Sequence, residues 1–237
     1  MDSVISRIRE GLDNLSNPDI KKTTQRFFKE PISCYGIKNP QVRTLAKKYW
    51  KEIKHKEKDE IFSLCEELYR SGKLEESFIV STWTYALSER YERQDIVVFR
   101  RWIDTYITNW ASCDDFCNHT LGDFLEKYPE YIDEIKKWTK SSNRWMRRAA
   151  AVSLIVPAKN GNFLKESIEI ADLLLIDSDD MVQKGYGWLL KEVSRHHQRE
   201  IFEYVMYNKS VMPRTSLRYA IELMPADLKS EAMRKER

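Results

Sequence analysis

Apolar residues recur at spacings of three and four along nearly the whole 237-residue chain, and this is the repeat of one helix face. The first run, Val4, Ile5, Ile8 and Leu12, sets the pattern. Glycine and proline number only seven each, too few to supply the turns of a β-sandwich or barrel of this length. The sequence therefore predicts an all-α protein with short connections.

The C-terminal half contains a weak internal repeat. Helical segments led by the basic residues Arg148, Lys184 and Arg218 follow one another at intervals of 36 and 34 residues. This period is typical of HEAT-like α-solenoids, in which antiparallel helix pairs bury their apolar faces against neighbouring pairs. We therefore expect a single HEAT-like repeat domain over residues 1–237, curved around a concave groove.

Charge is distributed unevenly along these expected helices. Residues 38–58 contain eight basic and two acidic side chains, residues 136–148 contain six basic and no acidic ones, and residues 166–180 contain six acidic and no basic ones. The basic clusters fall on second helices of pairs and the acidic run on a first helix. Stacked, they predict a positively charged concave groove, whose natural ligand is the phosphate backbone of duplex DNA. The alternative is that each lysine-rich helix is only a solvated face.

Other features limit the class of protein. No segment approaches eighteen uninterrupted apolar residues, so we expect no membrane span, and residues 1–14 lack the apolar core of a signal peptide. Cys113, Cys117 and His119 offer at most three metal ligands, and buried thiols explain the two cysteines better. We expect no metal and no cofactor.

The four cysteines, Cys34 and Cys65 among them, are sparse for this length and fit reduced thiols better than a disulfide framework. They therefore favour a cytoplasmic protein. We also expect a monomer, as is common for solenoids of this size, and a bacterial-type protein that is associated with the nucleoid when bound to DNA.

The segment around residue 112 predicts a helix start. Ser112 and Asp115 resemble a capping box that begins a helix running through Leu125. This places Asp114 in the first helical turn, where the helix dipole favours an ionised carboxylate. Trp110 precedes Asp114 by four residues, so the two side chains share one face.

Five segments carry a family resemblance. Residues 35–43 are similar to G-I-K-x-P-x-x-R, residues 109–114 to W-x-x-x-D, residues 144–150 to W-x-x-R-A-A, and residues 183–192 to Q-K-A-x-G-W-x-L-R-E. Residues 121–124 (LGDF) follow the second of these at the expected distance. Together they resemble the DNA alkylation repair family of AlkD-like, HEAT-like-repeat DNA glycosylases, over roughly residues 27–224.

The resemblance implies a role for individual residues. Asp114 corresponds to the catalytic carboxylate, Trp110 and Trp188 to the indoles that hold the sugar and backbone of the lesion, and Arg148 to the arginine beside them. We expect further DNA contacts from a basic set: Lys38, Arg43, Arg144, Arg147, Lys184, Lys191, Arg214 and Arg218.

The chemistry fits such a carboxylate. A purine alkylated at N3 or N7 is cationic and leaves readily, so an enzyme needs to stabilise an oxocarbenium-like sugar and position water. The expected activity is a monofunctional glycosylase for these purines, with the lesion held through its backbone.

Two departures keep alternatives open. Phe27 and Val156 stand where active members can carry tyrosine and lysine. The alternative is a non-catalytic relative that recognises branched or distorted DNA. A third hypothesis is a protein-interaction solenoid, because the architecture does not specify a ligand.

Overall fold

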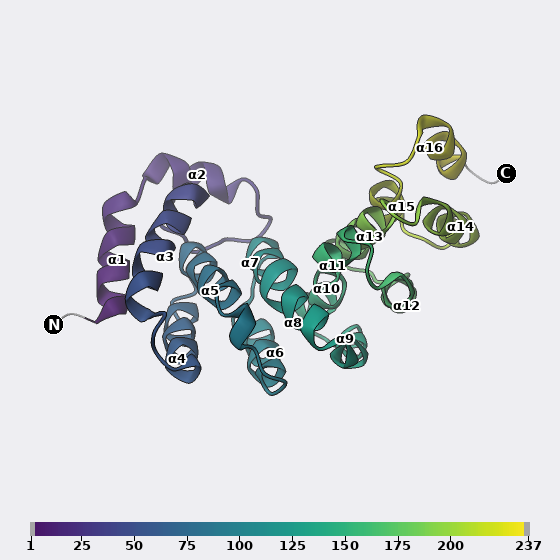
Figure 1. Ribbon diagram of the computed structural model, residues 1–237. Coiled ribbons are helices and arrows are strands. Elements are labelled where there is room, and N and C mark those ends of the chain that lie inside the picture. The colour runs from purple at the N-terminus through teal and green to yellow at the C-terminus, as the bar shows by residue number, and fades with distance from the viewer. Residues whose placement is uncertain (1–2, 235–237) are drawn as a thin grey trace. The chain divides into compact units, whose positions relative to one another are not determined.

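The computed structural model describes residues 3–234, and their secondary structure is helical. Within these residues there is no β-strand, only an isolated bridge between Ser33 and Lys73. The chain separates into two compact units, the first ending at Phe116 and the second beginning at Cys117. Each is built of packed antiparallel helices (Figure 1), so the predicted all-α solenoid architecture is confirmed. No helix in the described part is long and apolar enough to span a membrane.

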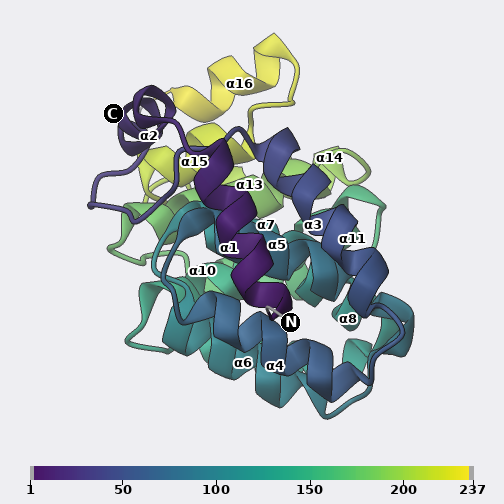
Figure 2. The same cartoon turned by 90° about the vertical axis from the view of Figure 1, so that its left-hand side faces the viewer.

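The first unit stacks its helices in two layers. Helices α3, α5 and α7 form one layer and α4 and α6 the other (Figure 1), while α1 packs against α3 and α4 at the end of the stack (Figure 2). The helices of this unit are α1 (Val4–Leu15), α2 (Pro18–Gln25), α3 (Asn39–Ile53), α4 (Lys58–Tyr69), α5 (Leu74–Tyr85), the 3₁₀ turn η1 (Ser88–Arg90), α6 (Asp95–Tyr106) and α7 (Trp110–Phe116).

An aromatic cluster holds these layers together. Phe62 and Tyr69 on α4, Phe99 and Trp102 on α6, and Phe116 on α7 are buried, with many of their ring centroids 5.3 to 6.4 Å apart. Most of these pairs meet edge to face, the arrangement that ring quadrupoles favour. Phe116 thereby fixes the end of α7 in the core.

The loop before α3 is held by a buried carboxylate. Glu75 is 2% exposed and accepts the backbone N–H groups of Tyr35, Gly36 and Ile37 at 2.8 to 3.1 Å. Gly36 has φ +84°, and a Cβ there would lie 2.4 Å from the carbonyl oxygen of Asn17, so only glycine fits. The glycine of the first family-like segment is thus required by the backbone geometry.

The second unit repeats the two-layer arrangement. Helices α10, α13 and α15 pack successively on one another, and α9, α12 and α14 lie along their other side (Figure 1). Its elements are the π-helical turn η2 (Cys117–Leu121), α8 (Gly122–Lys127), the 3₁₀ turn η3 (Pro129–Tyr131), α9 (Ile132–Trp138), α10 (Arg144–Val152), α11 (Ile155–Lys159), α12 (Leu164–Leu173), α13 (Asp180–Val193), α14 (Gln198–Asn208), α15 (Arg214–Ala220) and α16 (Ala226–Met233).

The internal repeat corresponds to real structural repeats. Arg148, Lys184 and Arg218 fall on α10, α13 and α15, the three helices that stack in succession. The four cysteines are buried thiols without a disulfide.

Candidate functional site

Helix α7 presents one partly exposed face. It buries Ser112, Cys113 and Phe116, and the Ser112 hydroxyl forms a buried 2.8 Å hydrogen bond with Ser77 of α5. Trp110 and Asp114, one turn apart, remain partly exposed. The sequence prediction that they share a face therefore agrees with the helix they occupy.

The predicted start of this helix is wrong. The helix is capped by Asn109, whose side-chain oxygen accepts the backbone N–H of Ser112 at 2.9 Å. The Ser112 hydroxyl does not cap the helix, because it is buried against α5. Asp114 is consequently the fifth residue of α7, beyond the first turn in which a helix dipole acts most strongly.

Trp110 is fixed by the loop that follows α2. Its indole N–H donates to the carbonyl of Phe27 at 3.3 Å, and its ring stacks on Phe28 with centroids 5.3 Å apart and planes at 21°. Gln25 organises this loop, because its side-chain amide donates to the carbonyl of Glu30 at 3.0 Å. The indole is therefore held from two directions.

Asp115, beside the predicted catalytic residue, binds inward. Arg43 of α3 donates from Nη2 to the Asp115 carboxylate. From Nη1 it donates to the Phe78 carbonyl at 2.9 Å and to Thr82 Oγ1 at 2.6 Å. Its Nε donates to Asn39 Oδ1 at 3.1 Å. Arg43 thus ties α3, α5 and α7 together and fixes the helix that carries Asp114.

In the second unit, Trp188 lies on α13 and is partly exposed. Its indole N–H donates to Glu192 Oε1 at 3.3 Å, one turn along the helix. Glu192 is 6% exposed and also accepts from Arg195. The indole is therefore oriented by a carboxylate that is itself paired.

The side chain of Arg148 is buried inside the second unit. It is 5% exposed, and Nη1 donates to the backbone carbonyl of Met181. Gly185 of α13 gives it room, because a Cβ there would lie 3.3 Å from Arg148 Cγ. In this arrangement Arg148 joins α10 to α13, and its predicted contact with a lesion stays a prediction.

Most of the predicted DNA-binding cations of the second unit are ion-paired. Arg144 meets Asp179 at 3.4 Å and also covers the Trp145 ring. The remaining pairs are Arg147 with Asp177 at 2.7 Å, Lys184 with Asp180 at 3.2 Å and Lys191 with Glu222 at 2.7 Å.

These pairs correct the expected charge layout. Asp177, Asp179 and Asp180 close the acidic run that sequence reasoning assigned to an outer first helix. Asp177 lies in the connection after α12, and Asp179 and Asp180 lie at the start of α13. All three pair with basic residues of α10 and α13. The charges therefore compensate one another locally, because the chain returns from α12 to α13 beside the basic helix.

The remaining predicted residues lie as follows. Lys38, Arg214 and Arg218 are exposed, and Arg214 donates to the Met233 carbonyl at 3.2 Å. Phe27 has a 70% exposed side chain, and Val156 is partly exposed on α11.

No metal-binding group was found within residues 3–234, where no three His, Cys, Asp or Glu side chains gather in a suitable cluster. Cys113 and Cys117, the pair considered as ligands, are both buried.

The fold defines an α-helical repeat protein, and two solved structures share it. A predicted DNA alkylation repair enzyme from Enterococcus faecalis superposes with a TM-score of 0.79 at 17% identity, covering 89% of this chain and 97% of that one. AlkD2 from Streptococcus mutans gives 0.63 at 19% identity, covering 94% and 100%. No curated protein matches the sequence.

Residues 8–224 match the family model described as DNA alkylation repair enzyme. The chain belongs to this DNA repair family.

Proposed function

We propose that the protein is a monofunctional DNA glycosylase that releases N3- and N7-alkylated purines from duplex DNA. The observation that carries the proposal is the partly exposed pair Trp110 and Asp114, one turn apart on a helix braced by the Arg43–Asp115 contact. A fixed carboxylate beside a fixed indole suits a cationic sugar-like transition state.

The proposed reaction is a hydrolysis. The bond between C1′ and the purine nitrogen breaks, and its electron pair neutralises the alkylated base, which leaves. Water adds its oxygen to C1′ while Asp114 stabilises the positive sugar and accepts the water proton. Trp188, in the second unit, keeps its predicted role at the sugar and backbone. Water is the co-reactant that balances this reaction.

The test is release of N7-methylguanine and N3-methyladenine from methylated duplex DNA. Wild type is compared with Asp114→Asn, which keeps the side-chain size and removes the base. We expect release by wild type alone, with DNA affinity nearly unchanged in the variant. Release that persists in Asp114→Asn would disprove the assignment of the carboxylate.

A second candidate is a non-catalytic DNA-binding relative that recognises branched or distorted DNA. The burial of Arg148, which is 5% exposed, favours it, because a lesion-clamping arginine has to reach the bound DNA. This candidate predicts no base release by either protein and tighter binding to a four-way junction than to a linear duplex.

We also propose that the protein is a monomer that acts in the cytoplasm and associates with the nucleoid when bound to DNA. Sedimentation in the presence and absence of duplex DNA tests the stoichiometry.

A further inference from the structure

The last residue of α2, Gln25, holds the loop that follows the helix. Its side-chain amide donates from Nε2 to the carbonyl of Glu30 at 3.0 Å and to that of Phe28 at 3.4 Å. Its Oε1 accepts the backbone N–H of Ile32 at 3.0 Å. One side chain therefore bonds to three backbone groups of residues 26–32, which form the loop after α2.

Apolar burial does little to fix this part of the chain. Helix α2 has no buried residue, none of residues 26–32 is buried, and the Phe27 side chain is 70% exposed. A segment with few buried apolar contacts opens at a low cost in free energy, so the conformation of this loop depends on its hydrogen bonds. Glutamine suits this role because its amide supplies donors and an acceptor together.

The loop after α2 also holds the indole of Trp110, which is 83 residues from Phe27 along the chain. The Phe27 carbonyl accepts the indole N–H, and the Phe28 ring stacks on the indole. Helix α7 sets the backbone of Trp110, but its side chain can still occupy several staggered rotamers. The two loop contacts select one rotamer, and both come from residues that lie between Gln25 and its bonded groups at Glu30 and Ile32.

We propose that Gln25 is a positioning residue for the Trp110 indole and acts through the loop after α2. The inference rests on the proposed glycosylase function, in which Trp110 contacts the lesion, and it adds the residue that orients this indole. A misplacement of about 1 Å at a reacting site can lower a rate about 100-fold. Loss of the Gln25 amide therefore impairs base release without removing a group of the candidate site.

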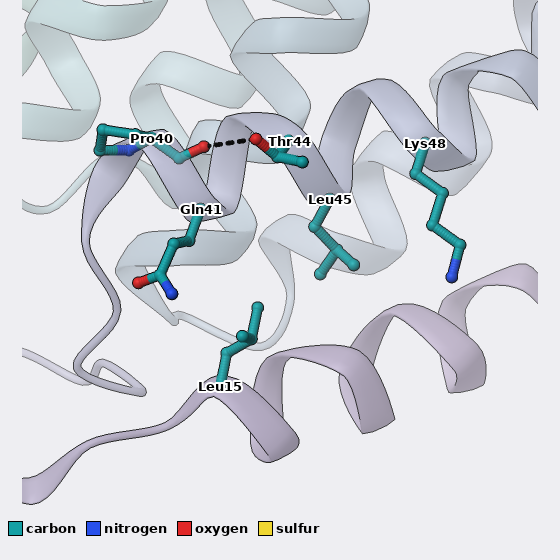
Figure 3. Close-up of a pocket in the computed structure, with 6 residues that line it drawn as sticks. All are labelled: Leu15, Pro40, Gln41, Thr44, Leu45 and Lys48. Carbon is teal, nitrogen blue, oxygen red and sulfur yellow. Dashed lines mark hydrogen bonds between the residues drawn. The ribbon is translucent and has the colours of Figure 1, made fainter.

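The test variant is Gln25→Met, which keeps the length of the side chain and removes its donors and its acceptor. Gln25→Glu keeps the acceptor for the Ile32 N–H but loses both donated bonds when it is ionised. The matched control is Gln41→Met on α3. In Figure 3 the Gln41 side chain extends from α3 towards α1, where it lines an apolar hollow with Leu15 and Leu45. Within the described part of the chain, no hydrogen bond engages this side chain.

The first measurement needs no DNA. In protein labelled with fluorotryptophan, the fluorine NMR resonance of Trp110 is identified by its absence from the spectrum of Trp110→Phe. The stacked Phe28 ring displaces this resonance in the wild type, because a neighbouring ring alters the local magnetic field. We expect the resonance to move towards that of a solvent-exposed indole in Gln25→Met, to move less in Gln25→Glu and to stay in place in Gln41→Met. Thermal unfolding confirms that the variants are folded.

The second measurement separates the rate of base release from DNA affinity. Single-turnover release from methylated duplex DNA is followed at saturating enzyme, and affinity is measured by anisotropy. We expect Gln25→Met to lower the saturated rate at least about tenfold and to leave affinity within about twofold of the wild-type value, because an interaction made only in the transition state changes the rate and not ground-state binding. Gln41→Met should keep both values.

A Trp110 resonance that stays in place in Gln25→Met, or that moves equally in Gln41→Met, would overturn the inference. A displaced resonance with an unchanged saturated rate would overturn it as well. If the wild type releases no base, the proposed function fails, while the resonance still decides whether Gln25 positions Trp110.

Discussion

Arg43 and Asp115 are separated by 72 residues and form an ion pair that joins α3 to α7. Three further hydrogen bonds join Arg43 to Asn39, Phe78 and Thr82. The guanidinium thus makes several contacts inside the first unit, and its expected contact with the DNA backbone stays a prediction. The position of Asp114 on α7 therefore depends on the ion pair that the adjacent Asp115 makes with Arg43.

Arg43→Ala should lower the rate of base release at least tenfold and leave the salt slope of DNA binding within about 0.3 of the wild-type value, since a lost phosphate contact would lower it by about 0.9. Arg43→Lys should recover part of the rate because it keeps the charge. Single-turnover rates and anisotropy titrations measure the two quantities. A slope reduced by a full contact would show that Arg43 binds phosphate, as the sequence suggested.

Trp110→Ala should release the loop after α2, because it removes both the stack on Phe28 and the hydrogen bond to the Phe27 carbonyl. We expect faster tryptic cleavage after Arg26 and Lys29, together with slower base release. Trp110→Phe keeps a ring and should lie between the two. Cleavage at the wild-type rate in Trp110→Ala would mean that the loop is held by other contacts.

Arg148→Met should destabilise the protein by about 1–3 kcal/mol, because it removes the hydrogen bond of a buried guanidinium to the Met181 carbonyl. Urea unfolding measures this change. Arg144→Met, in which a 30% exposed side chain is replaced, should cost less. Unchanged stability with weakened DNA binding would instead place Arg148 at the DNA.

Stability in acid should depend on Glu66 of α4. Burial opposes its ionised form, but hydrogen bonds from Trp102 and Tyr106 and the charges of Arg101 and Arg70 outweigh burial and lower its pKa below the ordinary value of 4.5. A carboxyl with a lowered folded-state pKa stabilises the fold above its unfolded pKa, and this contribution is lost as pH falls through the folded value.

Glu66→Gln should therefore lower the free energy of unfolding by about 2 kcal/mol near neutral pH and make it less sensitive to pH below about 4.5. Glu67→Gln, at a half-exposed position on the same helix, is the matched control. If the free energy of unfolding changes with pH in the same way for wild type and Glu66→Gln, the stabilising role of the ionised Glu66 carboxylate is contradicted.

Local sequence determined the helical class, the spacing of the repeat and the shared face of Trp110 and Asp114. The helical class and the shared face depend on residues within one or two helical turns, and a periodicity of 3.6 records such relationships directly. The period of 34 to 36 residues likewise identified the stacked helices α10, α13 and α15.

Only the tertiary structure decided which charges remain uncompensated. Arg43 meets Asp115 across 72 residues, and Arg144 meets Asp179 across 35, so a count of nearby charges could not reveal either pair. The start of α7 was missed for the same reason, because contact with Ser77 buries the hydroxyl of Ser112 and leaves capping to Asn109. Pairing between distant segments is set by how helices pack, and one-dimensional periodicity does not contain that information.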